Sequence, residues 1–427
     1  MNGYTLISCI GTGMYKKEGG YRKTTYQFPG TYKSHETTLF LEAVLKTTYR
    51  PIKKVILIGT RTSCWDMLIV DPDNNEDLFF KIHSECRNSD GISDISLVEL
   101  ESLLSKWHNI PVKIIVHTNE INRENVESVF SAYGSIPGLL EPETDILFDI
   151  SHGFRSMPLL VFQSLQLNAS KLFGRRVELI YGEYIENEQI SYVRDLSEYW
   201  NYYEIGSAIK LFEERLDGKL LAEKIEPFWE SGAKFLIRLS EIVECNFSLQ
   251  IPDALKQLKN ALKDFNEAGR PQWVIDVKNI HKEIFMKLSV KDNDKYPVAR
   301  TVWQYSQLLR EKKLITQAVI ALQVVVEASI TEKMDRSKIG DYVWFNCDNP
   351  MSLGLRENAN QQLKEIRRNH KKIKEPLEQL EYLRNQIAHG GGKDRNENYP
   401  HQANINGILK HIDDAIQELF TILDQDN

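Results

Sequence analysis

The sequence has few cysteines, no long apolar run and no excess of positive charge. Its five cysteines are widely spaced, odd in number and free of any CxxC pair, which predicts the reduced thiols of a cytosol and argues against a zinc ribbon. No segment of 18 apolar residues occurs, and the opening MNGYTLISCIGTG lacks the charged start of an export signal. The formal net charge of −7 excludes a globally basic surface, so any contact with nucleic acid must be local. We therefore expect a cytoplasmic protein with no membrane contact.

The 427 residues are enough for two or three domains of ordinary globular composition. Up to about residue 193, short β-rich runs alternate with helical stretches. The runs rich in Val, Ile and Tyr are 4–10, 53–58, 112–118, 144–150 and 177–184. The stretches with apolar residues at helical spacing are 36–49, 96–107 and 158–173. This alternation predicts an α/β domain with a parallel sheet and helices on both of its faces.

After about residue 194 the strand signal fades and the chain has helical periodicity. The predicted helices are 197–216, 232–244, 253–265, 314–328 and 405–423. Breaks fall at Ile251-Pro252, at Gly269-Arg270-Pro271, at the run KDNDKYP and at Asn349-Pro350. The sequence thus predicts three parts. These are an α/β domain over 1–193, a helical connector over 194–300 and an all-helical C-terminal domain over 301–427.

Three of the predicted strands end in similar chemistry, and ligands of open parallel sheets bind beyond such carboxyl ends. Glycines allow close approach of the backbone, hydroxyls and free N–H groups bind anionic oxygens, and arginines neutralise charge. This pattern is typical of a nucleotide or phosphodiester pocket. The candidate pocket residues are Gly11, Thr12, Gly13, Thr60, Arg61, Ser63, Ser151, His152, Gly153, Phe154, Arg155 and Ser156.

Other readings of these residues fail on spacing. The Gly-Thr-Gly turn lacks the third glycine of a dinucleotide fingerprint, and no acidic residue ends the second strand, which argues against a dehydrogenase. Ser151 and His152 are adjacent and belong to no nucleophile elbow. The run HETTL at His35 lacks the second histidine of a zinc helix, so we expect no metal there.

The stretch LRNQIAHGGG, 383–392, allows two readings. As an ordinary helix end, Leu383 and Ile387 pack inward, Arg384 faces solvent and His389 lies near a glycine cap. As a site, Arg384 is a phosphate-binding cation and His389 a titratable imidazole. Because Asn385 and His389 are four residues apart, they share one helix face. The spacing by itself does not decide between the two readings.

Taken together, these motifs resemble those of a known family. The run from Asp149 to Arg155, Asp-Ile-Ser-His-Gly-Phe-Arg, is similar to the Asp-x-Thr/Ser-His-Gly signature of one group of CRISPR-associated CARF domains. Gly59-Thr60, with Trp65 shortly beyond, also resembles that group. The arginine, asparagine and histidine of the LRNQIAHGGG stretch resemble the HEPN ribonuclease motif, and the order of sensor, connector and HEPN domain matches too. Ser151 replaces the commoner threonine, and the segment 14–30 has no counterpart.

The resemblance implies a Rossmann-like CARF domain that senses cyclic oligoadenylate and a HEPN domain that cuts single-stranded RNA in type III CRISPR defence. It implies a homodimer or higher homo-oligomer with a composite site of Arg384, Asn385 and His389, and no cofactor. No paired carboxylates lie near these residues to hold magnesium, so we expect the RNA 2′-hydroxyl to attack and to leave a 2′,3′-cyclic phosphate and a 5′-hydroxyl. A two-fold dimer favours cyclic tetra-adenylate, with the hexameric ring second.

Several alternatives stay open. Arg395 and His401 form a rival pair, although Pro400 places it in a predicted loop. The cationic run KEIRRNHKKIK, 364–374, either guides RNA or is a solvated helix face. The whole protein is alternatively a cyclic-oligoadenylate receptor, or a phosphodiesterase of the ring, without ribonuclease activity.

Overall fold

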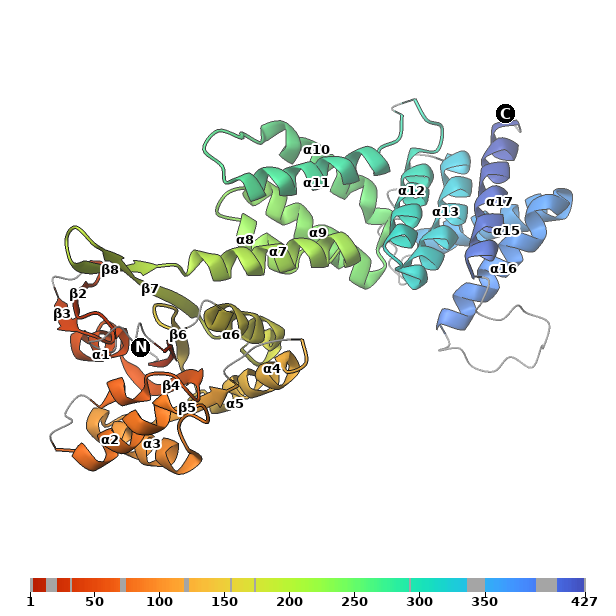
Figure 1. Ribbon diagram of the computed structural model, residues 1–427. Coiled ribbons are helices and arrows are strands. Elements are labelled where there is room, and N and C mark those ends of the chain that lie inside the picture. The colour runs from red at the N-terminus through yellow and green to blue at the C-terminus, as the bar shows by residue number, and fades with distance from the viewer. Residues whose placement is uncertain are drawn as a thin grey trace. The chain divides into compact units, whose positions relative to one another are not determined.

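The computed structural model describes ten stretches of the chain, which fall into two compact units, Met1–Tyr203 and Glu204–Asn427 (Figure 1). The described stretches are 3–12, 21–30, 33–69, 74–118, 123–153, 156–172, 174–291, 293–335, 350–388 and 405–425.

The N-terminal unit contains an eight-stranded sheet in the order β3-β2-β8-β7-β6-β1-β4-β5. The strands are β1 (Tyr4–Ile10), β2 (Thr24–Gln27), β3 (Ser34–Thr37), β4 (Ile52–Thr60), β5 (Val112–His117), β6 (Asp145–Asp149), β7 (Val177–Ile185) and β8 (Ile190–Asp195). All five strands predicted from the sequence are present. They are neighbours in the sheet and pair parallel with one another, in the order β7-β6-β1-β4-β5.

The prediction of a parallel sheet is wrong for the strands β8, β2 and β3 on one side of the sheet. β8 pairs antiparallel with β7, and β3 pairs antiparallel with β2. Only residues 186–189 separate β7 from β8, and a connection that short joins antiparallel strands, since a parallel pair needs a long crossover. β2 and β3 have four residues each, which gives too little alternation for a strand signal. The predicted helix over 36–49 is therefore also too long, because Glu36 and Thr37 belong to β3.

Helices cover both faces of the sheet, as predicted (Figure 1). One face carries α1 (Phe40–Thr47), η1 (Trp65–Leu68), α2 (Glu76–Arg87) and α3 (Asp94–His108). The other carries α4 (Val126–Gly134), α5 (Ile136–Leu139), α6 (Ser156–Leu167) and η2 (Ala169–Leu172). Alternate residues of each central strand enter opposite cores, for example Leu6 and Ile7 of β1. All seven residues of β1 are buried, as a central strand between two helical layers requires.

The C-terminal unit is helical in the part of the chain that the structure describes. Its elements are α7 (Glu198–Arg215, from residue 204 on), α8 (Lys219–Ile225), α9 (Glu230–Cys245), η3 (Ser248–Gln250), α10 (Ile251–Asp264), α11 (Gln272–Leu288), α12 (Pro297–Glu311), α13 (Ile315–Asp335), α15 (Pro350–Asn369), α16 (Lys371–Ala388) and α17 (Ile405–Gln425). The predicted helices are all present. The breaks at Pro252, Pro297 and Pro350 fall in the first turn of a helix, where proline is tolerated.

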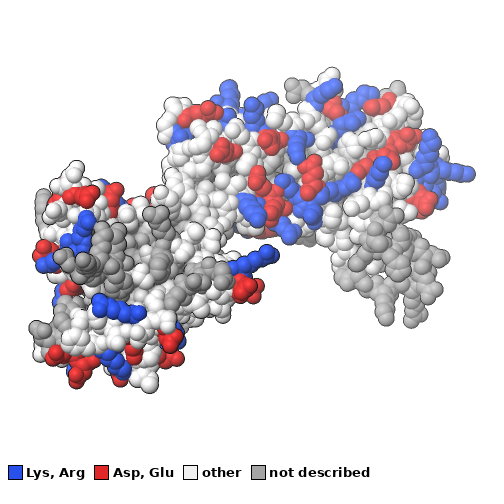
Figure 2. Space-filling view, in the orientation of Figure 1, with Lys and Arg blue, Asp and Glu red and all other residues white. Residues whose placement is uncertain are grey.

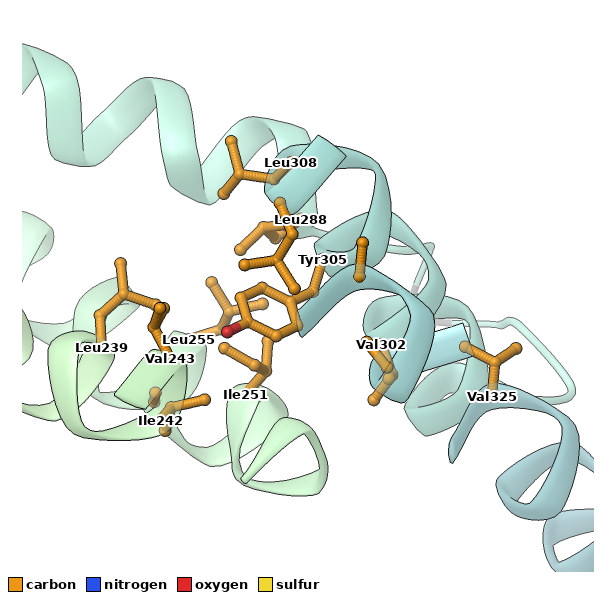
Figure 3. Close-up of a cluster of buried hydrophobic side chains, with 14 of the residues drawn as sticks. Leu239, Ile242, Val243, Ile251, Leu255, Leu288, Val302, Tyr305, Leu308 and Val325 are labelled. Carbon is orange, nitrogen blue, oxygen red and sulfur yellow. The ribbon is translucent and has the colours of Figure 1, made fainter. Parts of the chain in front are cut away.

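A single apolar core runs through this unit, from Ala208 to Leu423. Figure 3 shows its centre, where Tyr305 of α12 lies among Ile251, Leu255 and Leu288. The packing is thus continuous across residue 300. The division into a connector and a C-terminal domain at this residue remains a prediction. α13 lies in this core and is apolar enough over Ile315–Met334 to meet the length and composition of a membrane span, although 61% of that window is buried.

A polar contact joins α12 to α17 beside this core. The Asp413 carboxylate accepts hydrogen bonds from Trp303 Nε1 at 3.0 Å and from Gln307 Nε2 at 2.7 Å, and it forms an ion pair with Arg310. Both charged side chains are at most 20% exposed. One carboxylate therefore satisfies donors from three turns of α12.

We expect Asp413→Ala to lower the free energy of unfolding by about 2–4 kcal/mol, because it leaves a mostly buried guanidinium and two further donors without their acceptor. Urea unfolding followed by circular dichroism measures the change. Asp414→Ala is the matched control, since this neighbour is exposed and should change stability by less than about 0.5 kcal/mol. Equal effects of the two substitutions would contradict the role given to Asp413.

Candidate functional site

The structure brings the carboxyl ends of the neighbouring strands β6, β1 and β4 together. The loops after β1 and β6 touch at Gly11 and Gly153, where a Cβ on Gly11 would lie 2.9 Å from the Gly153 Cα. Gly153 has φ +105°, a backbone conformation that side chains disfavour. The loop after β4 joins them, because Cys64 N donates to Gly11 O at 2.9 Å. The predicted convergence of these strand ends is therefore confirmed.

The predicted pocket residues after β4 make hydrogen bonds that hold the turn at the end of this strand. Thr60 and Ser63 are wholly buried, and Ser63 Oγ donates to Ile10 O at 2.7 Å and accepts from Thr60 N at 2.9 Å. Trp65 Nε1 donates to Thr60 O at 2.8 Å, and its ring fills the space beside Gly59, which explains the Gly-Thr and Trp spacing. These hydroxyls shape the turn, and their contact with a ligand stays a prediction.

Arg61 has partners inside the protein. Its guanidinium lies 2.6 Å from Asp94 of α3 and donates to Ile92 O at 2.8 Å. A ligand that used Arg61 would compete with this exposed ion pair, which is worth little by itself. Thr12 accepts a hydrogen bond from Cys64 Sγ through its carbonyl, and Ser156 is the exposed first residue of α6. Gly13, Phe154 and Arg155 lie outside the described residues.

Asp149 is a structural carboxylate of the site that sequence reasoning did not place among the pocket residues. It is wholly buried, accepts from Ser8 Oγ at 2.5 Å and accepts from Ser151 N at 2.7 Å. Ser151 Oγ in turn accepts from Gly182 N at 2.8 Å. Burial raises the pKa of Asp149 to about 6, against the hydrogen bonds that lower it. Its place at the end of a strand, ahead of the serine and histidine, was the available signal.

His152 lies at the centre of the site. Its Nε2 accepts from Phe40 N at 3.2 Å and lies 3.4 Å from the Tyr26 hydroxyl. An Nε2 that accepts from an amide carries no proton, so the proton of the neutral ring is on Nδ1. Burial lowers the pKa of His152 to about 4, which agrees with a neutral ring. The second residue that sequence reasoning missed is Tyr21, whose ring lies 4.3 Å from the imidazole, centroid to centroid.

The candidate catalytic residues lie near the end of α16. Leu383 and Ile387 pack against the core, as the helical spacing predicts. The reading of this stretch as an ordinary helix end has Arg384 facing solvent. In the structure Arg384 is half-buried, and its Nε is buried without a hydrogen-bond partner among the described residues. Asn385 is exposed. The histidine of the motif, His389, and both members of the rival pair, Arg395 and His401, lie outside the described residues.

The cationic run 364–374 spans the end of α15, the single residue between the helices and the start of α16, where Lys and Arg side chains gather in Figure 2. Arg367 is a structural member, since it is 12% exposed and lies 2.8 Å from Glu381. The exposed cations are Lys364, Arg368, Lys371, Lys372 and Lys374. Thirteen residues of one helix separate Lys371 from Arg384, about 20 Å at 1.5 Å per residue. Among the described residues, no group of three or more His, Cys, Asp or Glu side chains is arranged to hold a metal ion.

Comparison with known proteins adds to this geometry. Residues 5–186 match the family model of the CARF domain of CRISPR system endoribonuclease Csx1. The chain is similar to CRISPR-associated protein MJ1674 of Methanocaldococcus jannaschii, with 22% identity over 326 residues, 70% of this chain and 50% of that protein. The chain thus spans half the length of this curated relative. Enterococcus italicus Csm6 bound to cyclic hexa-2′-fluoro-hexa-dAMP has 12% identity and a TM-score of 0.36 over 99% of this chain and 94% of its own, too low to carry an inference.

The buried carboxyl of Asp149 generates a prediction about pH. Folding raises its pKa from 3.8 to about 6, so folding favours the protonated form, and this contribution is full below about pH 4 and is lost as the pH rises through 6. From pH 4 to pH 7 the free energy of unfolding of the wild type should therefore fall relative to that of Asp149→Asn by about 2–2.5 kcal/mol. Urea unfolding of both proteins at the two pH values measures this. A difference that does not change with pH would show that Asp149 stays ionised.

Proposed function

We propose that this chain, a CRISPR-associated protein whose N-terminal unit is a Rossmann-like CARF domain, is an endoribonuclease that cyclic oligoadenylate activates. It cuts single-stranded RNA without a metal, in the cytoplasm, as an auxiliary effector of type III CRISPR antiviral defence. One observation carries the proposal: the CARF-matching segment brings three strand ends together around Gly11, His152 and Gly153, where an open sheet of this kind binds its ligand.

The strand-end site has the chemistry of a phosphodiester ring. Gly11 and Gly153 let the loops after β1 and β6 pack against each other, and α6 is a 12-residue helix whose N-terminus follows the signature directly. Arg155 supplies the positive charge, and the His152 ring supplies a flat face for an adenine base. A homodimer would present two such sites around a two-fold axis, which a ring of four identical nucleotides shares. Cyclic tetra-adenylate is therefore the favoured activator, ahead of the hexameric ring.

The catalytic step is assigned to the end of α16. Arg384 is suited to bind a phosphate, because a buried Nε without a partner gains a charge-assisted hydrogen bond when an anionic oxygen arrives. Asn385 is exposed on the same stretch and orients the phosphate. His389 takes the proton of the 2′-hydroxyl or donates one to the leaving 5′-oxygen. The new bond joins the 2′-oxygen to phosphorus, the bond from phosphorus to the 5′-oxygen breaks, and the products are a 2′,3′-cyclic phosphate and a 5′-hydroxyl.

Two copies of α16 facing each other complete the site, which makes a dimer necessary for activity. The exposed cations of the α15–α16 turn hold the RNA backbone along the same helix, a contact that weakens with salt. The activator increases cleavage only through its higher affinity for the active arrangement of the dimer, so its binding and the arrangement of the catalytic residues are coupled.

We expect His389→Ala to reduce RNA cleavage by at least two orders of magnitude, because positioned acid–base groups contribute about 10² to 10⁴ in rate. Dimerisation and activator affinity should not change. Cleavage of labelled RNA with saturating cyclic tetra-adenylate measures the loss. His411→Ala is the matched control, since His411 is exposed on α17. Retained cleavage in His389→Ala, together with an inactive His401→Ala, would move the site to the rival pair Arg395 and His401.

We expect Arg155→Ala to weaken activator binding by about 1.5–3 kcal/mol, the scale of one hydrogen bond to a charged group. Half-maximal cleavage should then need roughly 10- to 150-fold more activator, while the maximal rate stays near that of the wild type. Arg176→Ala is the control, because this exposed arginine precedes the amino end of β7, away from the carboxyl ends of the strands that form the site. If the activator concentration for half-maximal cleavage did not change while the maximal rate fell, Arg155 would have a structural role instead.

A further inference from the structure

Tyr21 occupies the strand-end site from within the chain. Its hydroxyl oxygen accepts a hydrogen bond from Gly11 N at 2.6 Å, and the hydroxyl donates to Gly11 O at 3.0 Å. Both polar groups of Gly11 are therefore bonded to one side chain of the same chain. Burial raises the pKa of Tyr21 above its ordinary value, so the hydroxyl keeps its proton at neutral pH and can make both bonds.

The ring of Tyr21 lies on His152. The two ring centroids are 4.3 Å apart and the planes differ by 34°, the separation of a tilted stack. The edge of the same imidazole is also occupied, because Nε2 accepts from Phe40 N and lies close to the Tyr26 hydroxyl. Tyr21 thus covers one face of the histidine ring.

These contacts resemble those that a nucleotide would make at the same points. A nucleobase is a flat aromatic ring that stacks on histidine, and a ribose or phosphate oxygen accepts from a backbone N–H beside a glycine. Tyr21 presents a flat ring and an oxygen at these two points. The side chain and a nucleotide of a ring therefore cannot occupy them together.

We propose that Tyr21 is an internal latch, a side chain that holds the place of the activator and sets the concentration at which the activator binds. The proposal rests on the function proposed above. Only the fraction of molecules with Tyr21 displaced is competent to bind, and the apparent dissociation constant equals the intrinsic constant divided by that fraction. The latch therefore raises the activation threshold without touching the catalytic residues.

Substitution of Tyr21 changes the affinity for the activator in opposite directions in the two possible roles of this residue. If Tyr21 competes with the activator, removing its bonds tightens binding. If Tyr21 is instead a platform on which the base of the activator stacks, removing its ring weakens binding. Tyr21→Phe keeps the ring and loses the two hydrogen bonds with Gly11, while Tyr21→Ala loses both kinds of contact.

The experiment measures binding of labelled cyclic tetra- and hexa-adenylate to the purified full chain by fluorescence polarisation. We expect Tyr21→Phe, which loses two neutral hydrogen bonds, to bind roughly 5- to 150-fold more tightly than the wild type, and Tyr21→Ala to gain more. Tyr49→Phe is the matched control, because Tyr49 packs on Phe28 in the core of the same unit, and its affinity should equal that of the wild type. Melting temperatures establish that each variant is folded.

A second readout needs no ligand. Hydrogen exchange of the peptide that contains Gly11 should be faster in Tyr21→Phe than in the wild type, because the amide has lost its acceptor. Unchanged exchange, or an affinity in either Tyr21 variant that is unchanged or weaker, overturns the latch while the proposed function stands. Absence of binding to the wild type, to Arg155→Ala and to both Tyr21 variants alike overturns the proposed function, and the latch with it. Binding to the Tyr21 variants in the absence of binding to the wild type supports both.

Discussion

The contact between Gly11 and Gly153 is the constraint on which the candidate site depends. The loops after β1 and β6 meet there with no room for a side chain on either residue, since a Cβ on Gly153 would in turn lie 2.9 Å from the Cys9 Cβ. Because β1 and β6 are neighbouring parallel strands, their carboxyl ends lie side by side, and the two glycines allow the loops to close on each other. His152 is held beside this contact by its position in the chain. The third loop, after β4, joins through the backbone hydrogen bond from Cys64 N to Gly11 O.

Buried polar groups keep this arrangement in place at some cost in stability. The carboxylate of Asp149 is removed from water, and hydrogen bonds from Ser8 Oγ and Ser151 N compensate it. These bonds join β1 to the loop after β6 without a ligand, which reduces the ordering that binding requires. Tyr21 then occupies the finished site, so that in this account the same geometry both recognises a nucleotide and withholds the site from it.

Much of the fold and of the candidate site was predictable from the sequence. The remainder was not predictable, and the reasons are physical. Strands of the parallel sheet are buried on both faces, so their apolar runs mark them clearly, as in β1 and β4. β2 and β3 have only four residues each and leave no comparable pattern. Local spacing also cannot show a partner far along the chain: the ion pair of Arg61 with Asp94 and the bonds of Tyr21 to Gly11 needed coordinates. Helical spacing also left the environment of Arg384 open, because at 100° per residue this side chain lies only about 60° from the inward-facing Ile387, and in the structure it is half-buried.

The most direct measurement is RNA cleavage by the purified chain in EDTA, with cyclic tri-, tetra- and hexa-adenylate tested in parallel. The account predicts little cleavage without a ring, strong cleavage with cyclic tetra-adenylate, and products with a 2′,3′-cyclic phosphate and a 5′-hydroxyl. An RNA with 2′-deoxy nucleotides at the cut positions should resist, because it lacks the attacking group. Absence of cleavage with every ring, or cleavage that stops in EDTA and returns with magnesium, would contradict the account.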